Sequence, residues 1–185
     1  MKKYVHRVKE EAIAIALFIA VIWVVFLLDF FLPLEIFGLI PREASGLWGI
    51  GAMTFLHGSY QHLLGNTIPL VVLLALLAGS RADSRKVVIY VALLGGILLW
   101  LFGRDGTIHI GASLLVFGLA TFLIVSGVLE KRTIPMIISV VVALVYGTSL
   151  IGGVIPWQRG ISWDGHFMGG AAGAITAWLL VKRAR

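Results

Sequence analysis

The chain has 185 residues, of which 59% are hydrophobic and only 13% are charged. A soluble domain is typically about 45–50% apolar and about 25% charged, so this composition excludes an ordinary soluble protein and predicts an integral membrane protein. In that setting the net charge of +6 does not indicate nucleic-acid binding, and we expect no nucleic-acid partner. The absence of cysteine excludes disulfides, cysteine-based metal sites and thiol nucleophiles.

Six segments are apolar enough to be membrane-spanning helices, which need about 20 mostly apolar residues. They run over about 12–32, 61–79, 87–102, 110–129, 134–151 and 165–181. The first of them has too long an apolar run for a signal peptide and no small-residue cleavage site after it, so we expect it to be permanent. Residues 1–185 are therefore predicted to form a single six-helix membrane domain.

The basic residues predict the orientation of these spans. Twelve of the 15 lie in the N-terminal tail, in the loops after the second and fourth spans, and in the C-terminal tail. They are Lys2, Lys3, Arg7, Lys9, Arg81, Arg85, Lys86, Lys131, Arg132, Lys182, Arg183 and Arg185. The other loops hold Arg42, Arg104 and Arg159. By the positive-inside rule, both termini are cytoplasmic. We interpret the cluster from Arg81 to Lys86 as a topology determinant and an anchor for lipid headgroups.

The first outer loop, about 33–60, is unusually long and apolar. We expect it to lie in the membrane interface and to contain short helices.

Four polar residues are expected at membrane depth, where polar groups are costly and are functional candidates. They are His62, Asn66, Ser113 and His166. Counted back along each helix from its cytoplasmic end, all four lie at a similar depth just below the outer face. His62 and Asn66 are four residues apart and share a helix face. The sequence predicts this common depth but not whether the side chains are neighbours.

These residue types can carry out acyl transfer. A serine hydroxyl needs a nearby base, and the candidates are Ser113 and His166. The backbone N–H of Ser113, the amide of Asn66 and a ring N–H of His62 could stabilise the oxyanion. We expect Asp164 to face the outer water, which predicts a Ser–His dyad rather than a triad.

Other interpretations remain open at this point. A membrane serine is often only a packing residue, and a membrane histidine is often a structural hydrogen-bonding group. Gly111 would let another backbone approach closely, and Gly169 and Gly173 form a GxxxG face that packs on a neighbouring helix. His57 and His109 are expected to be interfacial or supporting. A haem-carrying protein or a small transporter is also an alternative.

Three segments resemble the motifs of rhomboid intramembrane serine proteases. Residues 55–66 end in the pattern His-x-x-x-Asn, residues 109–113 end in Gly-Ala-Ser, and residues 166–173 read His-x-x-Gly-x-x-x-Gly. They occur in the order, and on the helices, that are typical of the family. The resemblance covers essentially the whole chain.

This resemblance implies an all-α membrane protein, a six-helix bundle of the minimal rhomboid type. It implies that Ser113 is the nucleophile, that His166 is the general base, and that His62, Asn66 and the backbone N–H of Leu114 bind the oxyanion. The substrates would be single-pass membrane proteins, cleaved in or near their transmembrane segment, and the reaction would need no cofactor or metal. We expect a multi-pass protein of a prokaryotic plasma membrane and leave its oligomeric state open.

The sequence departs from the family pattern at three positions. Leu114 replaces a frequent glycine, and Phe117 stands where many members have a tyrosine that stacks on the catalytic histidine. Gly49 follows Trp48 where many members have arginine, so the first outer loop is expected to lose an anchor. An alternative function is therefore a catalytically weak or inactive rhomboid-like protein that binds transmembrane segments. For a protease, we expect substrate to enter beside span 134–151, which contains Gly147, and the loop around Trp157.

Overall fold

The computed structural model describes residues 2–81, 83–156 and 160–182, with side chains described from 8 to 181 within those ranges. Among these residues the regular structure is helical, apart from an isolated antiparallel bridge between Leu39 and His109. The long helices are α1 (Lys2–Asp29), α3 (Tyr60–Ser80), α4 (Ser84–Phe102), α5 (Ser113–Glu130), α6 (Thr133–Gly153) and α7 (Trp163–Lys182). The short ones are η1 (Leu34–Phe37), η2 (Ala44–Trp48), α2 (Gly49–Ala52) and η3 (Met53–Phe55).

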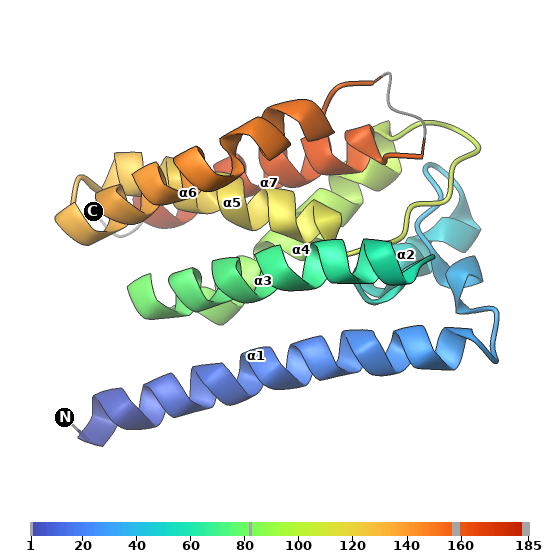
Figure 1. The fold of residues 1–185 in the computed structure, drawn as a ribbon. Helices are drawn as coiled ribbons and strands as arrows, with labels where there is room; N and C mark the ends of the chain where they lie inside the picture. Colours follow the sequence, from blue (N-terminus) through green and yellow to red (C-terminus); the bar gives the residue numbers. More distant parts are fainter. Residues whose placement is uncertain (1, 82, 157–159, 183–185) are drawn as a thin grey trace.

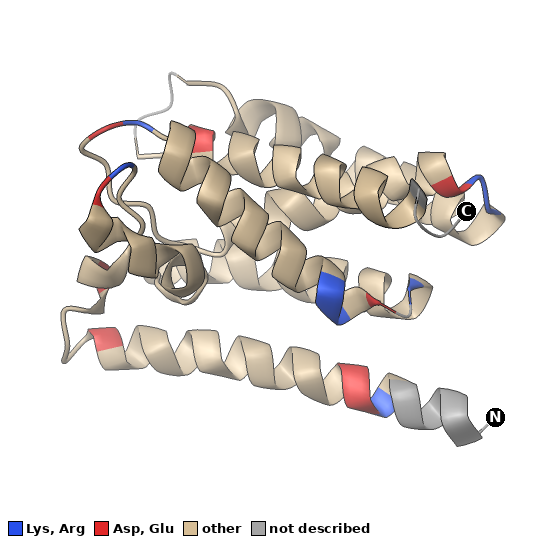
Figure 2. Ribbon diagram, turned by 180° about the vertical axis from the view of Figure 1, so that it is seen from behind, with Lys and Arg blue, Asp and Glu red and all other residues tan. Residues whose placement is uncertain are grey.

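The long helices lie side by side in a bundle, with the short helices gathered at one end (Figure 1). Helix α1 begins and helix α7 ends at the opposite end of the bundle. Charged residues occur mainly at the two ends, and the middle of the bundle is almost free of them (Figure 2). This distribution matches an apolar membrane core between two polar boundaries.

Five helical segments are long and apolar enough to cross a membrane, within the part of the chain that the structure describes. They are Val8–Asp29, Tyr60–Ser80, Ser84–Phe102, Ser113–Glu130 and Thr133–Gly153. The expectation of an all-helical membrane protein is confirmed. The sixth expected span, about 165–181, forms the regular helix α7 but is not among these five. Its polar first turn and its glycines make it less apolar than the others.

Helix α5 is the centre of the bundle. In its most apolar 18-residue window 56% of the residues are buried, against 11% in α1 and in α6. Helix α7 packs closely on α5 because two glycines leave room for the neighbouring backbone: a Cβ on Gly169 would overlap the Leu114 carbonyl oxygen, and one on Gly173 would overlap that of Gly118. Helix α1 is tied to α3 by the Trp23 indole N–H, which donates to the Thr67 hydroxyl at 3.2 Å.

Two predicted boundaries were wrong. The first span ends at Asp29 rather than near residue 32. The fourth begins at Ser113 rather than at 110, because the Leu39–His109 bridge and the φ of 113° at Gly111 hold the preceding residues outside the helix.

The first outer loop is held firmly on α4, although the expected anchor is missing. Trp48 is 75% exposed. Arg42 provides an anchor instead, because its guanidinium donates to the carbonyl oxygens of Leu101 at 3.0 Å and Gly103 at 2.7 Å and pairs with Asp105. The anchor expected to be lost at Gly49 is therefore replaced by a different arginine, which joins the loop to the end of α4.

At the other end of the bundle, the position of Arg81 differs from the expected lipid-headgroup anchor. Its side chain is only 13% exposed and pairs with Asp83 at 2.8 Å and with Glu130. It ties the α3–α4 turn to the end of α5, so it is not a free anchor for lipid headgroups. Several residues used in the sequence argument lie outside the described residues: Trp157, Arg159, Arg183 and Arg185 entirely, and Lys2, Lys3, Arg7 and Lys182 as side chains.

Candidate active site

The four polar residues expected at one depth line one cavity of about 820 Å³. His62 and Asn66 come from α3, Ser113 from the start of α5 and His166 from the start of α7. The cavity lies at the end of the bundle that carries the short helices, and Phe117 and Ser162 are also in its wall. The tertiary structure thus brings together residues for which the sequence predicted only a common depth.

Ser113 is the first residue of α5, and the chain before it is held by the loop that precedes α3. The Gly111 N–H donates to the Met53 carbonyl at 2.8 Å, and the Ala112 N–H donates to Nε2 of His57 at 3.3 Å. The N–H groups of the first turn of a helix, here beginning with Ser113 and Leu114, have no partner within the helix. Together with the helix dipole they form a site suited to negative charge.

The ring of His166 is held, among the described residues, by a hydrogen bond and a ring contact. Its Nδ1 lies 2.9 Å from the carbonyl oxygen of Gly153, the last residue of α6. Because a carbonyl oxygen can only accept, Nδ1 carries the proton in this contact, and Nε2 of the neutral ring is left as a proton acceptor. The ring stacks on Phe117 with centroids 4.0 Å apart and an angle of 12° between the planes. Phenylalanine therefore provides the ring contact at this position without a hydroxyl group.

Among the described residues, the hydroxyl of Ser113 makes no hydrogen bond to His166, although both line the cavity. Nucleophile–base contacts are often long in substrate-free enzymes and shorten when substrate binds.

His62 and Asn66 lie beside the segment that leads to Ser113. A Cβ on Gly111 would lie 2.5 Å from both Cε1 and Nε2 of the His62 ring, so the group that approaches this glycine is an imidazole. The expected close backbone approach is present on the N–H side of Gly111, where the Met53 carbonyl accepts, and the space on the Cβ side is taken by the His62 ring. The Asn66 amide N–H donates to the His62 carbonyl oxygen at 3.1 Å, and the residue is 6% exposed.

The side chain of Leu114 is accommodated by a glycine on α4. Leu114 is 3% exposed, and its Cδ2 lies 2.6 Å from the position that a Cβ of Gly95 would take. The larger residue after the serine is thus packed away from the cavity, and its backbone N–H stays at the start of α5.

His57 has a supporting position. It is 1% exposed, its ring contacts that of His62 at a centroid distance of 5.1 Å, and its Nε2 accepts from the backbone next to Ser113. Burial lowers the pKa of His57 to about 4, and the nearby His62 acts in the same direction. His57 is therefore neutral at physiological pH, as its role as an acceptor requires.

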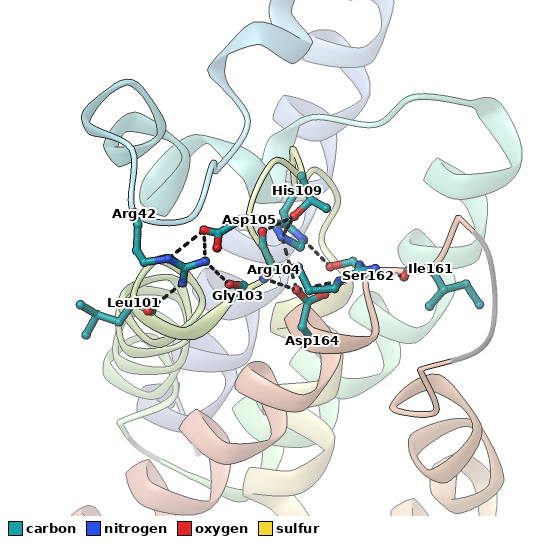
Figure 3. Close-up of polar contacts among 10 residues, drawn as sticks. Arg42, Leu101, Gly103, Arg104, Asp105, His109, Ile161, Ser162 and Asp164 are labelled. Carbon is teal, nitrogen blue, oxygen red and sulfur yellow. Dashed lines mark hydrogen bonds and ion pairs between the residues drawn. The ribbon is translucent and has the colours of Figure 1, made fainter.

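The expectation that Asp164 faces the outer water was wrong. This residue is 2% exposed, and both of its oxygens are bound by Arg104, whose Nη2 lies 3.1 Å from Oδ1 and whose backbone N–H lies 2.9 Å from Oδ2 (Figure 3). His109 is also buried beside it, with Nε2 3.6 Å from Oδ2. A signal was present in the sequence, because Arg104 and Asp164 are opposite charges in two loops expected on the same side.

Asp164 does not complete a triad in this arrangement. Within the described part of the chain, the hydrogen-bond partner of His166 Nδ1 is a backbone carbonyl rather than a carboxylate. The geometry offers a serine, a neutral histidine with a free acceptor nitrogen, and several N–H donors around one cavity. These groups are the components of serine-type acyl transfer.

Comparison with known proteins gives a family match and bacterial relatives. A family model described as the Rhomboid domain matches residues 44–183. An uncharacterized protein of Mycobacterium tuberculosis and one of Mycobacterium bovis are each 40% identical over 175 residues, covering 88% of this chain and 72% of theirs. An uncharacterized protein of Mycobacterium leprae is 36% identical over 178 residues, covering 91% of this chain and 70% of its own.

Proposed function

The chain belongs to the rhomboid family, and from this premise we infer that it is an intramembrane serine endopeptidase that cleaves single-pass membrane proteins in or near their transmembrane segment. The observation that carries this proposal is the orientation of His166. Its Nδ1 donates to Gly153, so Nε2 is the nitrogen available to accept a proton in the cavity that Ser113 also lines.

The proposed reaction follows the serine-protease scheme. Nε2 of His166 takes the hydroxyl proton as Ser113 Oγ attacks the scissile carbonyl carbon. The oxyanion is bound by N–H donors from the first turn of α5, including that of Leu114, and from the side chains of Asn66 and His62. The imidazolium then gives the proton to the leaving amine, and the acyl-enzyme forms. Water, activated by the same nitrogen, releases the second product and restores the serine.

The proposed topology has six spans, with α7 as the sixth and both termini in the cytoplasm of a prokaryotic cell. Three observations support it. Helix α7 lies against α5 along the bundle, α1 begins at the end where α7 ends, and the relatives are bacterial proteins. The cavity would then open toward the outer side of the membrane, from which water can reach the acyl-enzyme.

We place substrate entry beside α6. In its most apolar window only 11% of the residues are buried, and α6 packs mainly on α5, so its displacement would disturb few contacts with the other helices. Because the chain has no cysteine, a pair of introduced cysteines can join α6 to α3 without side reactions. Such a cross-link is expected to stop cleavage of a transmembrane substrate, and full cleavage in the cross-linked protein would refute this route.

The central experiment compares wild type with Ser113→Ala and His166→Ala on a single-pass reporter substrate in liposomes. Both variants are expected to lose cleavage. Ser126→Ala is the matched control, because Ser126 is a second serine of α5, is buried, and among the described residues its hydroxyl donates to the Leu123 carbonyl oxygen of its own helix. A fluorophosphonate is expected to label wild type and Ser126→Ala but not Ser113→Ala.

Unchanged cleavage in either dyad variant would refute the proposed mechanism. If wild type binds the reporter but never cleaves it and is not labelled, the protein is instead a rhomboid-like protein that binds transmembrane segments.

A further inference from the structure

A partly buried polar cluster at the wall of the cavity has no part in the proposed reaction scheme. It consists of Arg104, His109, Ser162 and Asp164, and it joins the loop after α4 to the start of α7 (Figure 3). Two of its members are almost fully buried, with Asp164 2% and His109 3% exposed. Burying a carboxylate is costly unless it is paired and hydrogen-bonded, so this cluster calls for an explanation.

The cluster satisfies Asp164 from both sides. Arg104 contributes three N–H groups: its backbone N–H at 2.9 Å, Nε at 3.2 Å and Nη2 at 3.1 Å. Its guanidinium also lies over the Trp163 ring, 5.4 Å from the centroid. Because several N–H groups of Arg104 bind one carboxylate in a forked contact, they fix the orientation of the Asp164 side chain as well as its distance from Arg104. A single point charge would fix only the distance.

His109 extends the cluster to the loop that precedes α7. Its Nδ1 lies 2.7 Å from the Ser162 hydroxyl, and its Nε2 lies 2.8 Å from the Thr107 hydroxyl. The backbone of His109 forms the bridge with Leu39, with N–O distances of 2.8 and 2.9 Å. The residue therefore connects the first outer loop, the loop before α5 and the loop before α7.

The positions of these residues in the chain connect the cluster to the proposed dyad. Asp164 lies two residues before His166, and His109 lies four residues before Ser113. The N–H of His166 donates to the carbonyl oxygen of Ser162 at 2.9 Å. Any shift of the first turn of α7 relative to the segment before α5 would thus change the separation of Ser113 and His166.

We propose that Asp164 is a positioning residue, which through Arg104 and His109 holds the first turn of α7 against the segment leading into α5 and so sets His166 relative to Ser113. This inference rests on the proposed protease function. It assigns Asp164 a role in the rate of the chemical step. Arg104, His109 and Ser162 line the cavity, whereas Asp164 is not part of the cavity wall, so a substitution of Asp164 tests positioning without changing a residue of the wall.

The test uses Asp164→Asn, which keeps the shape of the side chain and removes its charge. A displacement of about 1 Å in a catalytic group can reduce the rate about 100-fold, so we expect kcat to fall between about 10- and 100-fold. KM is expected to change less than about twofold, because Asp164 does not line the cavity and its substitution removes no contact with bound substrate. The rate of fluorophosphonate labelling of Ser113 should fall together with kcat.

The matched control is Asp105→Asn. Asp105 is the neighbour of Arg104 and is also paired with an arginine, but its side chain is 84% exposed and its partner is Arg42. We expect kcat of this variant to stay within about twofold of wild type, because an exposed ion pair contributes little. A double variant, Asp164→Asn with Arg104→Gln, should be no slower than the slower single variant, because both changes break one contact.

The outcomes separate this inference from the proposed function. A normal kcat in Asp164→Asn beside an inactive Ser113→Ala would overturn the positioning role alone. Cleavage by Ser113→Ala would overturn the proposed function, and the positioning role with it. If Asp164→Asn does not fold, Arg104→Lys replaces it, because it keeps the charge and loses the forked contact. A kcat of Arg104→Lys equal to wild type would then overturn the inference.

Discussion

At Gly111 the absence of a side chain gives the His62 imidazole its place beside the serine. The φ of 113° is one that residues with a Cβ rarely adopt, and the space a Cβ would need is taken by the His62 ring. Gly106 also has a positive φ, of 67°, but nothing lies within 4 Å of the place its Cβ would take. Gly106 therefore serves as a control for a positive φ without lost space, whereas Gly111 combines a less accessible φ with a space that is already occupied.

We predict that Gly111→Ala abolishes or nearly abolishes cleavage, whereas Gly106→Ala keeps most of it. Gly106→Ala carries a strain of about 1 kcal/mol from the left-handed backbone. Gly111→Ala carries more strain, because a φ of 113° lies outside the region open to residues with a Cβ, and it also displaces His62. Initial rates on the reporter substrate and melting temperatures in the same detergent provide the measurement. Equal activity of the two variants would show that the position of His62 does not matter.

The lowered pKa of His57 predicts that the free energy of unfolding depends on pH. The pKa of His57 is lowered to about 4 in the folded protein, and the unfolded side chain titrates near 6.5. Between these values the unfolded chain binds a proton that the folded chain excludes, so the free energy of unfolding falls as the pH drops from about 6.5 toward 4. Above about 6.5 both states are neutral at this residue, and its contribution is constant.

The slope from this residue is expected to be at most about 1.4 kcal/mol per pH unit, the value for one whole proton. Thermal unfolding of wild type and His57→Gln in detergent, over the range from about pH 4.5 to 8, measures it. Burial also lowers the pKa of His109, so part of the slope should remain in the variant. A slope unchanged by His57→Gln would contradict the prediction.

At the scale of elements, the contact between α5 and α7 positions the two residues of the dyad. Each helix begins at the cavity, and glycines on α7 let the two backbones approach. In the membrane such approach is stabilised by van der Waals packing rather than by the hydrophobic effect, so the available space is decisive.

We predict that Gly173→Ala lowers the melting temperature, because the added Cβ overlaps the Gly118 carbonyl oxygen and backbone cannot move aside cheaply. Overpacking of this kind typically costs about 1–3 kcal/mol. Gly147→Ala on α6 is the matched control, since nothing lies within 4 Å of its Cβ position, and it should be neutral or slightly stabilising. Thermal unfolding in detergent compares the two, and a Gly173→Ala protein as stable as wild type would show that α5 and α7 can separate freely.

At the scale of the whole molecule, the proposed orientation assigns the two charged ends of the bundle to opposite sides of the membrane. The end with the cavity holds the short helices, and the other holds the Arg81–Glu130 pair. The lack of native cysteine makes this orientation directly measurable.

We predict that Ser45→Cys is labelled by a membrane-impermeant maleimide in intact cells and that Thr133→Cys is labelled only after the membrane is opened. Both positions are exposed, and both substitutions are conservative, so access to reagent is the variable that differs. Labelling of Thr133→Cys alone in intact cells would reverse the proposed orientation.

Hydropathy and residue spacing were enough to predict the membrane class, the helical segments to within a few residues, and a common depth for His62, Asn66, Ser113 and His166. Hydropathy and the rise per residue are properties of each helix alone, so they can be obtained without knowing its neighbours. The match of three short motifs also indicated the family before any geometry was known.

The neighbours of these residues follow from the packing of the helices and could not be predicted from the sequence. The proton of His166 is directed by a carbonyl at the end of α6, Gly111 makes room for a ring from α3, and Asp164 is buried by an arginine from another loop. Each of these contacts joins segments that are far apart in the chain. Which segments become neighbours depends on how the helices pack against one another laterally. Depth along a helix says nothing about that packing, because every rotation of the helix about its axis leaves the depth unchanged.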